Sequence, residues 1–394
     1  MTMLRRIFLF SFTILPFMLS AQSYKKLHFK SMVVDTHNDI LSKAVENGIV
    51  IDADLTGKTH SDLNRFLKGG IDVQVFSVWC DGERKEPFNW ANREMDSLDA
   101  VIQRNPDKIV KTGTPEELRQ AVKNHKLAAM FGVEGGHMIE NNLDNLNKFF
   151  DRGTRYMTLT WNNSTDWATS AEDETQHAAN LKHKGLTDFG RQVIQRMNKL
   201  GMMVDLSHVG EQTFYDAIAA STKPIIVSHS CVYNICPVSR NLKDAQIKAV
   251  QQNGGVIDLN FFSGFVDSNY NKHQDEFLQR HKAEMDSLLQ IKPDKYYAYD
   301  ILFSKYADEV EAMRPPLSLL IDHLDYIVNL IGVDYVGLGS DFDGINSSPK
   351  ELNDVTDMPL ITKELKKRGY SKKEIKKILG GNFMRVFEAN MSGL

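Results

Sequence analysis

Residues 32–39 read MVVDTHND, a short apolar run that ends in a histidine and an aspartate. Its β-branched start is typical of a buried strand. Seven further runs have the same character: VQVFSVW at 73–79, LAAMFGVEG at 127–135, RYMTLTW at 155–161, MMVDLSH at 202–208, PIIVSH at 224–229, GVIDLNF at 255–261 and YVGLGSD at 335–341. Because these runs are continuous rather than alternating, they indicate a sheet that is covered on both faces.

The segments between the runs have the pattern of amphipathic helices. Residues 115–125 follow Thr114, a good N-cap, and begin with proline at the first helical position. Residues 189–201 place apolar side chains at helical spacing and end in glycine, and residues 316–332 repeat that pattern. Strand–helix alternation repeated about eight times predicts an α/β fold, a (β/α)8 TIM-type barrel. A doubly wound open sheet is the alternative.

The length of the chain bounds the number of domains. Its 394 residues, 42% of them hydrophobic, suffice for one large domain or two ordinary ones. We predict a single barrel domain over residues 22–394, with a helical segment at 350–394. Residues 264–316, before the last strand, are far longer than a usual connection. We expect this insertion to be ordered, with a helix over 276–290, and to act as a lid or an interface element.

Residues 1–21 have the features of a cleaved signal peptide. Arg5 and Arg6 precede the apolar run IFLFSFTILPFML, and small residues precede Gln22. A membrane anchor is the alternative, but the run is short against the ~20 residues of a spanning helix. No cysteine follows for a lipoprotein anchor, and the polar end EANMSGL does not suit a GPI signal. We therefore expect a periplasmic or secreted protein without a stable membrane anchor.

Charge and cysteine content exclude two further classes. A net charge of -4 and a pI near 6.3 give no electrostatic reason to expect nucleic acid as a partner. The three cysteines, Cys80, Cys231 and Cys236, are too few for a disulfide framework. Either one Cys231–Cys236 bridge or buried free thiols would fit.

Side chains that bind metals end or follow several of the predicted strands. They are His37, Asp39, Glu134, His208 and His229. Parallel barrel enzymes build their sites at the carboxyl ends of the strands, so we expect these side chains to meet. One such histidine would usually be a core residue, but three imidazoles with two carboxylates suit Zn²⁺ and accept Mn²⁺ or Co²⁺.

Residues 337–344, GLGSDFDG, follow the last predicted strand. GLG resembles the start of a dinucleotide-binding fingerprint, but Phe342 occupies the position of the third glycine. A calcium loop is excluded because the later ligands are missing. Asp341 is better suited to be a catalytic base or a ligand of a positive group.

Motifs in order along nearly all of the chain after residue 21 resemble those of one family. They are VVDTHNDIL, GVEGG, RYMTLT, VDLSHVG, IIVSHS, SRN, VGLGSDFDG and GGNFMRVFEA. The family is that of the membrane dipeptidases, also called renal dipeptidases, which are binuclear zinc peptidases on a (β/α)8 barrel. The resemblance implies that His37 and Asp39 hold one zinc ion, that His208 and His229 hold the other, and that Glu134 bridges them.

The resemblance also implies roles around the metals. Asp341 matches the aspartate beside the water that bridges the metals, and Arg240 matches the arginine that binds the substrate's terminal carboxylate. Two positions depart from the family pattern. Trp161 stands where the family has a histidine near the scissile carbonyl, and Phe262 stands where it has an active-site tyrosine. The disulfide of the animal enzymes is absent too, because Asn163 stands where the partner of a cysteine would fall.

The sequence thus predicts an exported zinc dipeptidase whose substrates are free dipeptides and which acts through a metal-bridging water. Asp341 would take the proton of that water, and the guanidinium of Arg240 would limit substrate length. One alternative is a related barrel amidohydrolase acting on a non-peptide amide or a β-lactam. Another is a non-catalytic peptide-binding protein, although a binder needs neither five metal ligands nor a base. A homodimer stays open.

Overall fold

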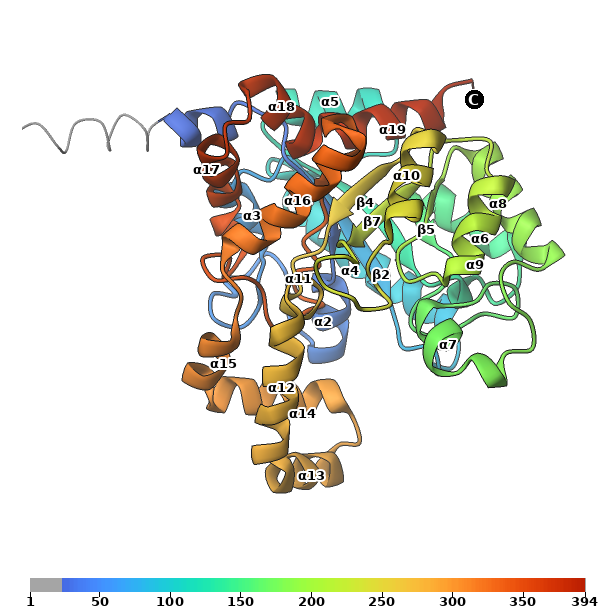
Figure 1. Ribbon diagram of the computed structural model, residues 1–394. Coiled ribbons are helices and arrows are strands. Elements are labelled where there is room, and N and C mark those ends of the chain that lie inside the picture. Colours follow the sequence, from blue (N-terminus) through green and yellow to red (C-terminus); the bar gives the residue numbers. More distant parts are fainter. Residues whose placement is uncertain (1–22, 394) are drawn as a thin grey trace, which may run out of the picture.

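Eight parallel strands form a barrel in which each strand is hydrogen-bonded to the next along the ring (Figure 1). The computed structural model describes residues 23–393, so the predicted signal peptide at 1–21 lies outside the described residues. The strands are β1 Val34–Asn38, β2 Val73–Trp79, β4 Leu127–Glu134, β5 Thr154–Thr158, β6 Met203–Asp205, β7 Ile226–Ser230, β8 Val256–Leu259 and β9 Val336–Leu338. The predicted (β/α)8 barrel is confirmed, and the open sheet is wrong.

The ring closes between β1 and the residues that follow β9. The backbone N–H of Asp341 donates to the carbonyl of His37 at 3.0 Å, and that of Asp39 donates to the carbonyl of Phe342 at 2.9 Å. These bonds bring the ends of β1 and β9, about 300 residues apart in the chain, into one layer. A short additional strand, β3 Ile109–Lys111, pairs only with the start of β4 and was not predicted.

Helices cover the outside of the barrel. They are α2 Ile40–Asn47, α3 Leu63–Gly69, α4 Pro87–Arg104, α5 Pro115–Lys123, α6 Leu143–Arg152, α8 Asp188–Leu200, α9 Glu211–Ala220, α10 Asp244–Asn253 and α16 Leu317–Ile331, with a short helix α7 Ala171–Gln176 in the β5–β6 connection. The three predicted helices correspond to α5, α8 and α16. Thr114 caps α5 by accepting from the backbone of Glu117, as its sequence predicts.

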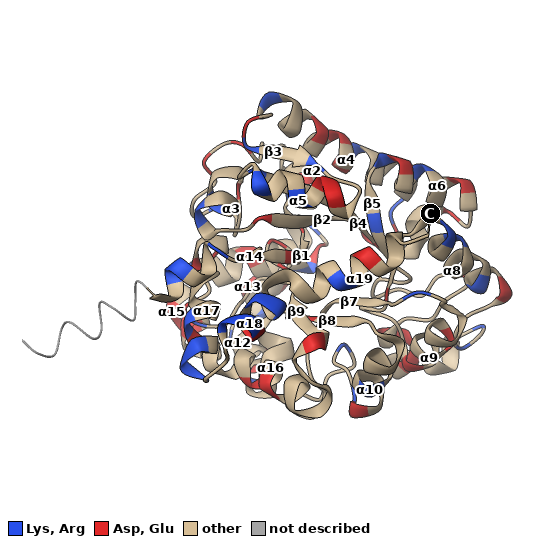
Figure 2. Ribbon diagram, turned by 90° about the horizontal axis from the view of Figure 1, so that it is seen from above, with Lys and Arg blue, Asp and Glu red and all other residues tan. Residues whose placement is uncertain are grey.

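The barrel has an apolar floor at the amino-terminal end of its strands. Inward side chains such as Val34, Val73 and Met130 pack against Phe383 and Phe387 of α19, Asn382–Met391. Figure 2, which looks onto this end, shows α19 lying across the strands. The separate, larger core lies between the strands and the outer helices. Polar side chains therefore collect at the opposite, carboxyl end.

The predicted insertion is helical, as expected. After the short α11, Ser263–Val266, it consists of α12 Ser268–Arg280, α13 Lys282–Ile291, α14 Lys295–Lys305 and α15 Ala307–Met313. We call residues 268–313 the lobe. The helix predicted over 276–290 is broken at His281, between α12 and α13. The lobe has a small core of its own, made of Tyr270, Phe277, Leu302, Phe303, Val310 and Met313.

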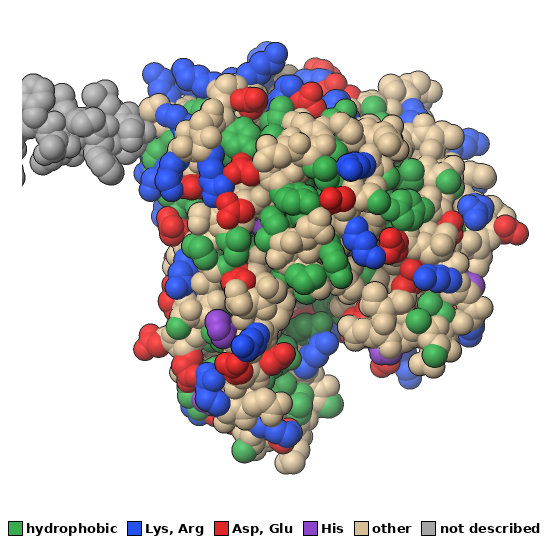
Figure 3. Space-filling view, viewed as in Figure 1, with side chains coloured by type: hydrophobic (Ala, Val, Ile, Leu, Met, Phe, Trp, Pro, Cys, Tyr) green, Lys and Arg blue, Asp and Glu red, His purple; other side chains and the backbone are tan. Residues whose placement is uncertain are grey.

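The lobe projects from the carboxyl end of the barrel (Figure 1). Figure 3 shows the surface hollowed between the lobe and the part of the chain around α7. Towards its carboxyl end the chain forms α17 Pro359–Lys367, α18 Lys372–Lys376, a π-helical turn at Lys377–Gly381 and α19, in agreement with the helical segment predicted there. That residues 22–394 form a single domain stays a prediction.

The structure shows the state of the three cysteines and whether its helices could span a membrane. Cys80, Cys231 and Cys236 are all buried free thiols, so the Cys231–Cys236 bridge does not form. Among residues 23–393, no helix is both long enough and apolar enough to cross a membrane.

Candidate metal centre and active site

The five predicted metal ligands come together at the carboxyl end of the barrel. His37 lies in β1, Glu134 is the last residue of β4, and His229 lies in β7. Asp39 follows β1 and is the N-cap of α2. His208 lies three residues beyond β6, with a φ of 65°, so the apolar run ends in a turn.

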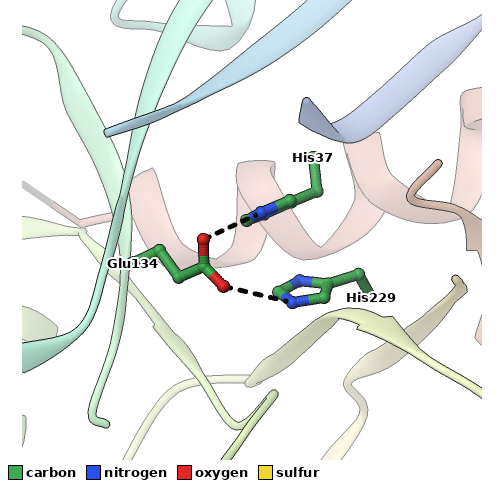
Figure 4. A group of neighbouring side chains, drawn as sticks. All are labelled: His37, Glu134 and His229. Atoms are coloured by element: carbon green, nitrogen blue, oxygen red, sulfur yellow. Dashed lines mark ion pairs between the residues drawn. The ribbon is translucent and has the colours of Figure 1, made fainter. Parts of the chain in front are cut away.

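The carboxylate of Glu134 lies at the centre of the cluster. Its Oε2 is 3.2 Å from Nε2 of His37, and its Oε1 is 2.8 Å from Nε2 of His208 and 3.5 Å from Nε2 of His229. Figure 4 shows this carboxylate between His37 and His229. All four side chains are almost completely buried. Glu134 thus presents one oxygen to one histidine and the other oxygen to a pair.

Two aspartates complete the cluster on the side of His37. Oδ2 of Asp39 lies 3.4 Å from Nε2 of His37. One potential ligand atom from each of His37, Asp39 and Asp341 lies within 4.8 Å of the others. Gly344 is required here, because a Cβ at this position would collide with the carboxylate of Asp39.

Hydrogen bonds outside the cluster orient His37. Its Nδ1 lies 2.7 Å from the hydroxyl of Tyr156, and that hydroxyl donates to the carbonyl of Thr36 at 2.9 Å. Tyr156 has one proton to donate, so it accepts from His37. The proton of a neutral His37 is therefore on Nδ1, and the lone pair of Nε2 faces Glu134.

The other two histidines are oriented in the same way. Nδ1 of His229 lies 2.8 Å from Oγ of Ser228, which itself donates to Oδ2 of Asp205 at 2.7 Å. Nδ1 of His208 lies 3.0 Å from Oδ1 of Asn162, an acceptor. Both neutral imidazoles therefore turn unprotonated Nε2 atoms toward the centre, as histidine ligands of metals do.

This arrangement fits a bound cation. The Nε2 atoms of His208 and His229 lie 3.0 Å apart, and in these tautomers neither can donate to the other. Nε2 of His37 and Oδ1 of Asp39 are buried without a hydrogen-bond partner. Burial without partners is costly for such atoms, and a cation between them would offset that cost. The described residues contain a second group with ligand spacing, formed by His37, Asp39 and Asp341.

The pKa values also favour positive charge at the centre. Burial lowers the pKa of His208 to about 4, and the charge of Arg240 adds to this. Burial opposes ionisation of Glu134, but its histidine neighbours outweigh burial, so the pKa of Glu134 is well below its usual range. Burial, and then the charge of Asp39, raise the pKa of Asp341 well above its usual range. Burial and neighbouring charged groups together shift these three pKa values.

Arg240 lies beside His229, in the loop after β7. Its Nη1 donates to Oγ of Ser230 at 3.2 Å, and its Nη2 donates to the carbonyl of His229 at 3.3 Å. The guanidinium carbon lies 5.3 Å from the centre of the Phe265 ring. Burial lowers the pKa of Arg240 to about 10, so it stays charged at neutral pH. Its Nε is buried without a partner, which leaves hydrogen-bonding capacity for an anion.

Trp161 and Phe262 have different surroundings. The half-buried Trp161 lies beyond β5, with its ring 6.5 Å from that of His208. Phe262 packs against Phe265 at 5.0 Å and against Tyr270 of the lobe at 6.0 Å. Trp161 therefore lies beside the metal cluster, whereas Phe262 packs against the lobe.

Sequence analysis missed the residues that orient the ligands. They are Tyr156, Asn162, Asp205, Ser228 and Asn260, the last of which donates to Oδ2 of Asp341 at 2.8 Å. The repeated Ser-His pair at 207–208 and 228–229 was a signal in the sequence, but it does not reveal which atoms the serines contact.

Known proteins with similar sequences belong to the family that the motifs resemble. The family model of the membrane dipeptidases, peptidase family M19, matches residues 21–392. An uncharacterized dipeptidase of Schizosaccharomyces pombe is 30% identical over 392 residues, which cover 94% of this chain and 83% of that protein.

Two solved structures have the same fold. The probable dipeptidase PvdM from Pseudomonas aeruginosa matches with a TM-score of 0.77 at 23% identity, covering 95% of this chain and 98% of that one. A metallo peptidase from Rhodobacter sphaeroides, liganded with a phosphinate mimic of the dipeptide L-Ala-D-Ala, matches with a TM-score of 0.72 at 21% identity, covering 91% and 99%. The chain belongs to the membrane dipeptidase family, peptidase family M19, and is a metallo-dipeptidase of that family.

Proposed function

We propose that this protein is an exported, zinc-dependent dipeptidase that holds two zinc ions per chain. His37 and Asp39 would hold one ion, His208 and His229 the other, and Glu134 would lie between them. The observation that carries this proposal is the convergence of three histidine Nε2 atoms on the two oxygens of Glu134. Nitrogen and carboxylate donors suit Zn²⁺, and Mn²⁺ or Co²⁺ would be accepted.

The protein's own residues would position the substrate and move a proton. When bound, the cations would polarise the scissile carbonyl and make water a better nucleophile at neutral pH. Oδ2 of Asp341 already accepts from Asn260, so Oδ1 is the atom that would accept the proton of the attacking water. The same oxygen would return the proton to the leaving amine.

Arg240 would select dipeptides by their free carboxylate. Its guanidinium is charged and next to the cluster, and the Nε atom is buried. A carboxylate bound there bidentately would leave room for about two residues between it and the cations. The dipeptide mimic bound by the Rhodobacter sphaeroides relative supports this substrate class.

Metal analysis combined with a substrate panel tests the proposal. We expect purified protein to contain two equivalents of zinc and to cleave L,L or L,D dipeptides but not tripeptides. Removal of the metal by a chelator should abolish turnover, and added Zn²⁺ should restore it. Equal rates on a dipeptide, its amide and a tripeptide would favour the amidohydrolase alternative, and metal binding without turnover would favour the peptide-binding alternative.

The role of Arg240 has a separate test. Arg240→Met should raise KM for free dipeptides and leave kcat nearly unchanged, because it removes binding that substrate and transition state share. The preference for a dipeptide over its amide should disappear as well. If the variant kept both the parent KM and that preference, the carboxylate would have to bind elsewhere.

A further inference from the structure

Two tryptophans form an aromatic wall beside the metal cluster. The rings of Trp79 and Trp161 meet edge to face, with centroids 5.0 Å apart. Trp161 continues the wall to His208, at a ring distance of 6.5 Å. An edge-to-face pair of this kind is a stable arrangement that offers ring faces to a further apolar group.

The wall is held rigidly at Trp79, the last residue of β2. Its backbone N–H donates to Oε2 of the buried Glu94 at 2.7 Å, and its carbonyl accepts from Nε1 of Trp90 at 3.2 Å. Trp90 also donates to Oε1 of Glu94 at 2.9 Å. Because both backbone groups of Trp79 are bound, the end of β2 that carries its ring is held in place.

The lobe presents apolar side chains at its tip. The large hydrophobic side chains that are exposed in the described chain are Phe29, Val50, Ile291 and Tyr296. Ile291 is 73% exposed and Tyr296 is 41% exposed, and they flank the loop between α13 and α14. Figure 1 shows this loop on the side of the lobe toward α7, and Figure 3 shows the hollow between them.

Tyr296 lies in the first turn of α14, next to the loop that borders the hollow. Burial by surrounding protein is the main cause that raises the pKa of its phenol, and the charges of Asp81, Glu172 and Glu134 add to it. These three acids come from the loop after β2, from α7 and from the end of β4. With 41% of its surface exposed beside that loop, Tyr296 can contact a molecule in the hollow.

The charges beside Tyr296 agree with this position. Burial raises the pKa of Glu46 in α2. The charges of Lys292 and Asp294, in the loop before α14, also act on this carboxylate. The lobe starts after β8, so its tip extends across the opening to the elements around β1 and β2. Trp79, the last residue of β2, places the wall of the two tryptophans at this same end of the barrel.

A dipeptide bound as proposed above would have a defined direction in this site. Its carboxylate lies with Arg240 after β7, and β2 is on the opposite side of the ring of strands. The residue whose carbonyl is attacked then projects its side chain toward β2 and β5. We propose that Trp79, Trp161 and Tyr296 form the pocket for the side chain of the amino-terminal residue, and that the enzyme selects dipeptides in which this side chain is aromatic or large and apolar. This inference rests on the proposed function.

Matched dipeptides and two variants test the pocket. The quantity measured is kcat/KM of the zinc-loaded enzyme for Phe-Ala, Ala-Phe and Ala-Ala. We expect Phe-Ala to exceed both others by at least about tenfold, as differences of several methylenes in an apolar pocket allow. Tyr296→Ala should reduce the ratio of kcat/KM for Phe-Ala to that for Ala-Ala by about threefold or more. Phe29→Ala, which removes an exposed aromatic ring just before β1, at the opposite end of the barrel, should keep the parent ratio.

The outcomes separate this inference from the proposed function. Cleavage of all three dipeptides at similar rates would overturn the pocket and leave the dipeptidase intact. A parent ratio retained in Tyr296→Ala would remove the lobe from the pocket and so overturn the assignment of Tyr296. Failure of the zinc-loaded enzyme to cleave any dipeptide would overturn both.

Discussion

Each carboxylate oxygen of Glu134 faces a different part of the histidine cluster, at 3.2 Å from His37 on one side and 2.8 Å from His208 on the other. Glu134→Gln replaces one of these oxygens by an amide nitrogen, which does not bind a cation and carries protons. We expect the variant to lose bound zinc and activity. Metal content after dialysis, measured by mass spectrometry, checks this, with the exposed Glu116→Gln as control. Two equivalents of zinc together with normal turnover would contradict the assignment of Glu134.

Trp161 stands where a histidine is expected near the scissile carbonyl, so its role can be tested by removing only its N–H. Trp161→Phe keeps an aromatic ring beside His208 and should lower kcat by about tenfold or less, because a wall does not depend on the donor. Loss of a hydrogen bond to a developing oxyanion would cost on the order of 10²–10³ in kcat. Steady-state kinetics therefore decide between the two roles. Trp161→Leu, which removes the ring, gives the comparison for loss of the wall.

Residue types and spacing predicted the cluster but not its local geometry. His37, Glu134 and His229 could be found because they end strands, and strand ends meet in a barrel. His208 and Asp341 lie three residues beyond their strands with φ values of 65° and 59°. Such left-handed positions have no sequence signal in non-glycine residues. The contacts of Nδ1, which orient the imidazoles, also depend on tertiary structure alone.

At the scale of elements, β6 is held to β7 mainly by one side chain. Its ladder with β7 is a single pair, while Oδ1 of Asp205 accepts from the backbones of Ser207 and Ser228, and Oδ2 accepts from the hydroxyls of Thr158 and Ser228. Asp205 thus replaces ladder bonds between β6 and β7, and its bond from Thr158 adds to the ladder with β5. This arrangement also orients Ser228 toward His229.

Asp205→Asn should destabilise the protein because an amide nitrogen would face donors at one of these positions. We expect the free energy of unfolding to fall by about 3 kcal/mol, the scale for lost hydrogen bonds to a buried charge. Urea unfolding of the zinc-loaded protein checks this, with the exposed Asp151→Asn as control. A change within about 0.5 kcal/mol, the range of ordinary surface substitutions, would show that the four hydrogen bonds are replaceable.

Element types were predicted better than element ends. The apolar runs at 202–208 and 335–341 give strands of three residues each, because the chain turns away where side chains enter the site. β3 has the sequence IVK, too short for a periodic signal. The break at His281 lies in a stretch with continuous helical character, and its cause is the packing of α12 and α13 around the core of the lobe.

At the scale of the whole molecule, His28 ties the start of the described chain to distant helices. It is fully buried, with Nε2 2.9 Å from the carbonyl of Gly69 in α3 and Nδ1 2.8 Å from the hydroxyl of Thr362 in α17. Burial lowers its pKa from 6.5 to about 4, and the bond to Gly69 opposes this only in part. The folded protein therefore keeps His28 neutral at a pH where the unfolded chain takes up a proton.

The sign of the pH effect follows from this difference. The stabilising contribution of a neutral His28 is complete above pH 6.5 and is lost as the pH falls toward 4. At pH 4.5 the loss should be about 2 kcal/mol. We expect the fall in unfolding free energy between pH 7 and pH 4.5, measured with urea, to be smaller by that amount in His28→Gln. The exposed His273→Gln should behave like the parent, and an equal fall in all three proteins would mean that His28 does not couple folding to pH.

The floor formed by α19 has a consequence for how molecules enter and leave. Phe383 and Phe387 close the amino-terminal end of the barrel against inward side chains of the strands. In the part of the chain that the structure describes, the site can therefore be reached only from the carboxyl end, beneath the lobe. The dipeptide would therefore enter, and both released amino acids would leave, through the same opening. The amino acid freed at the carboxyl side keeps the carboxylate that Arg240 would hold, and the other product gains a carboxylate at the metal cluster, so both products would compete with the next dipeptide for the site.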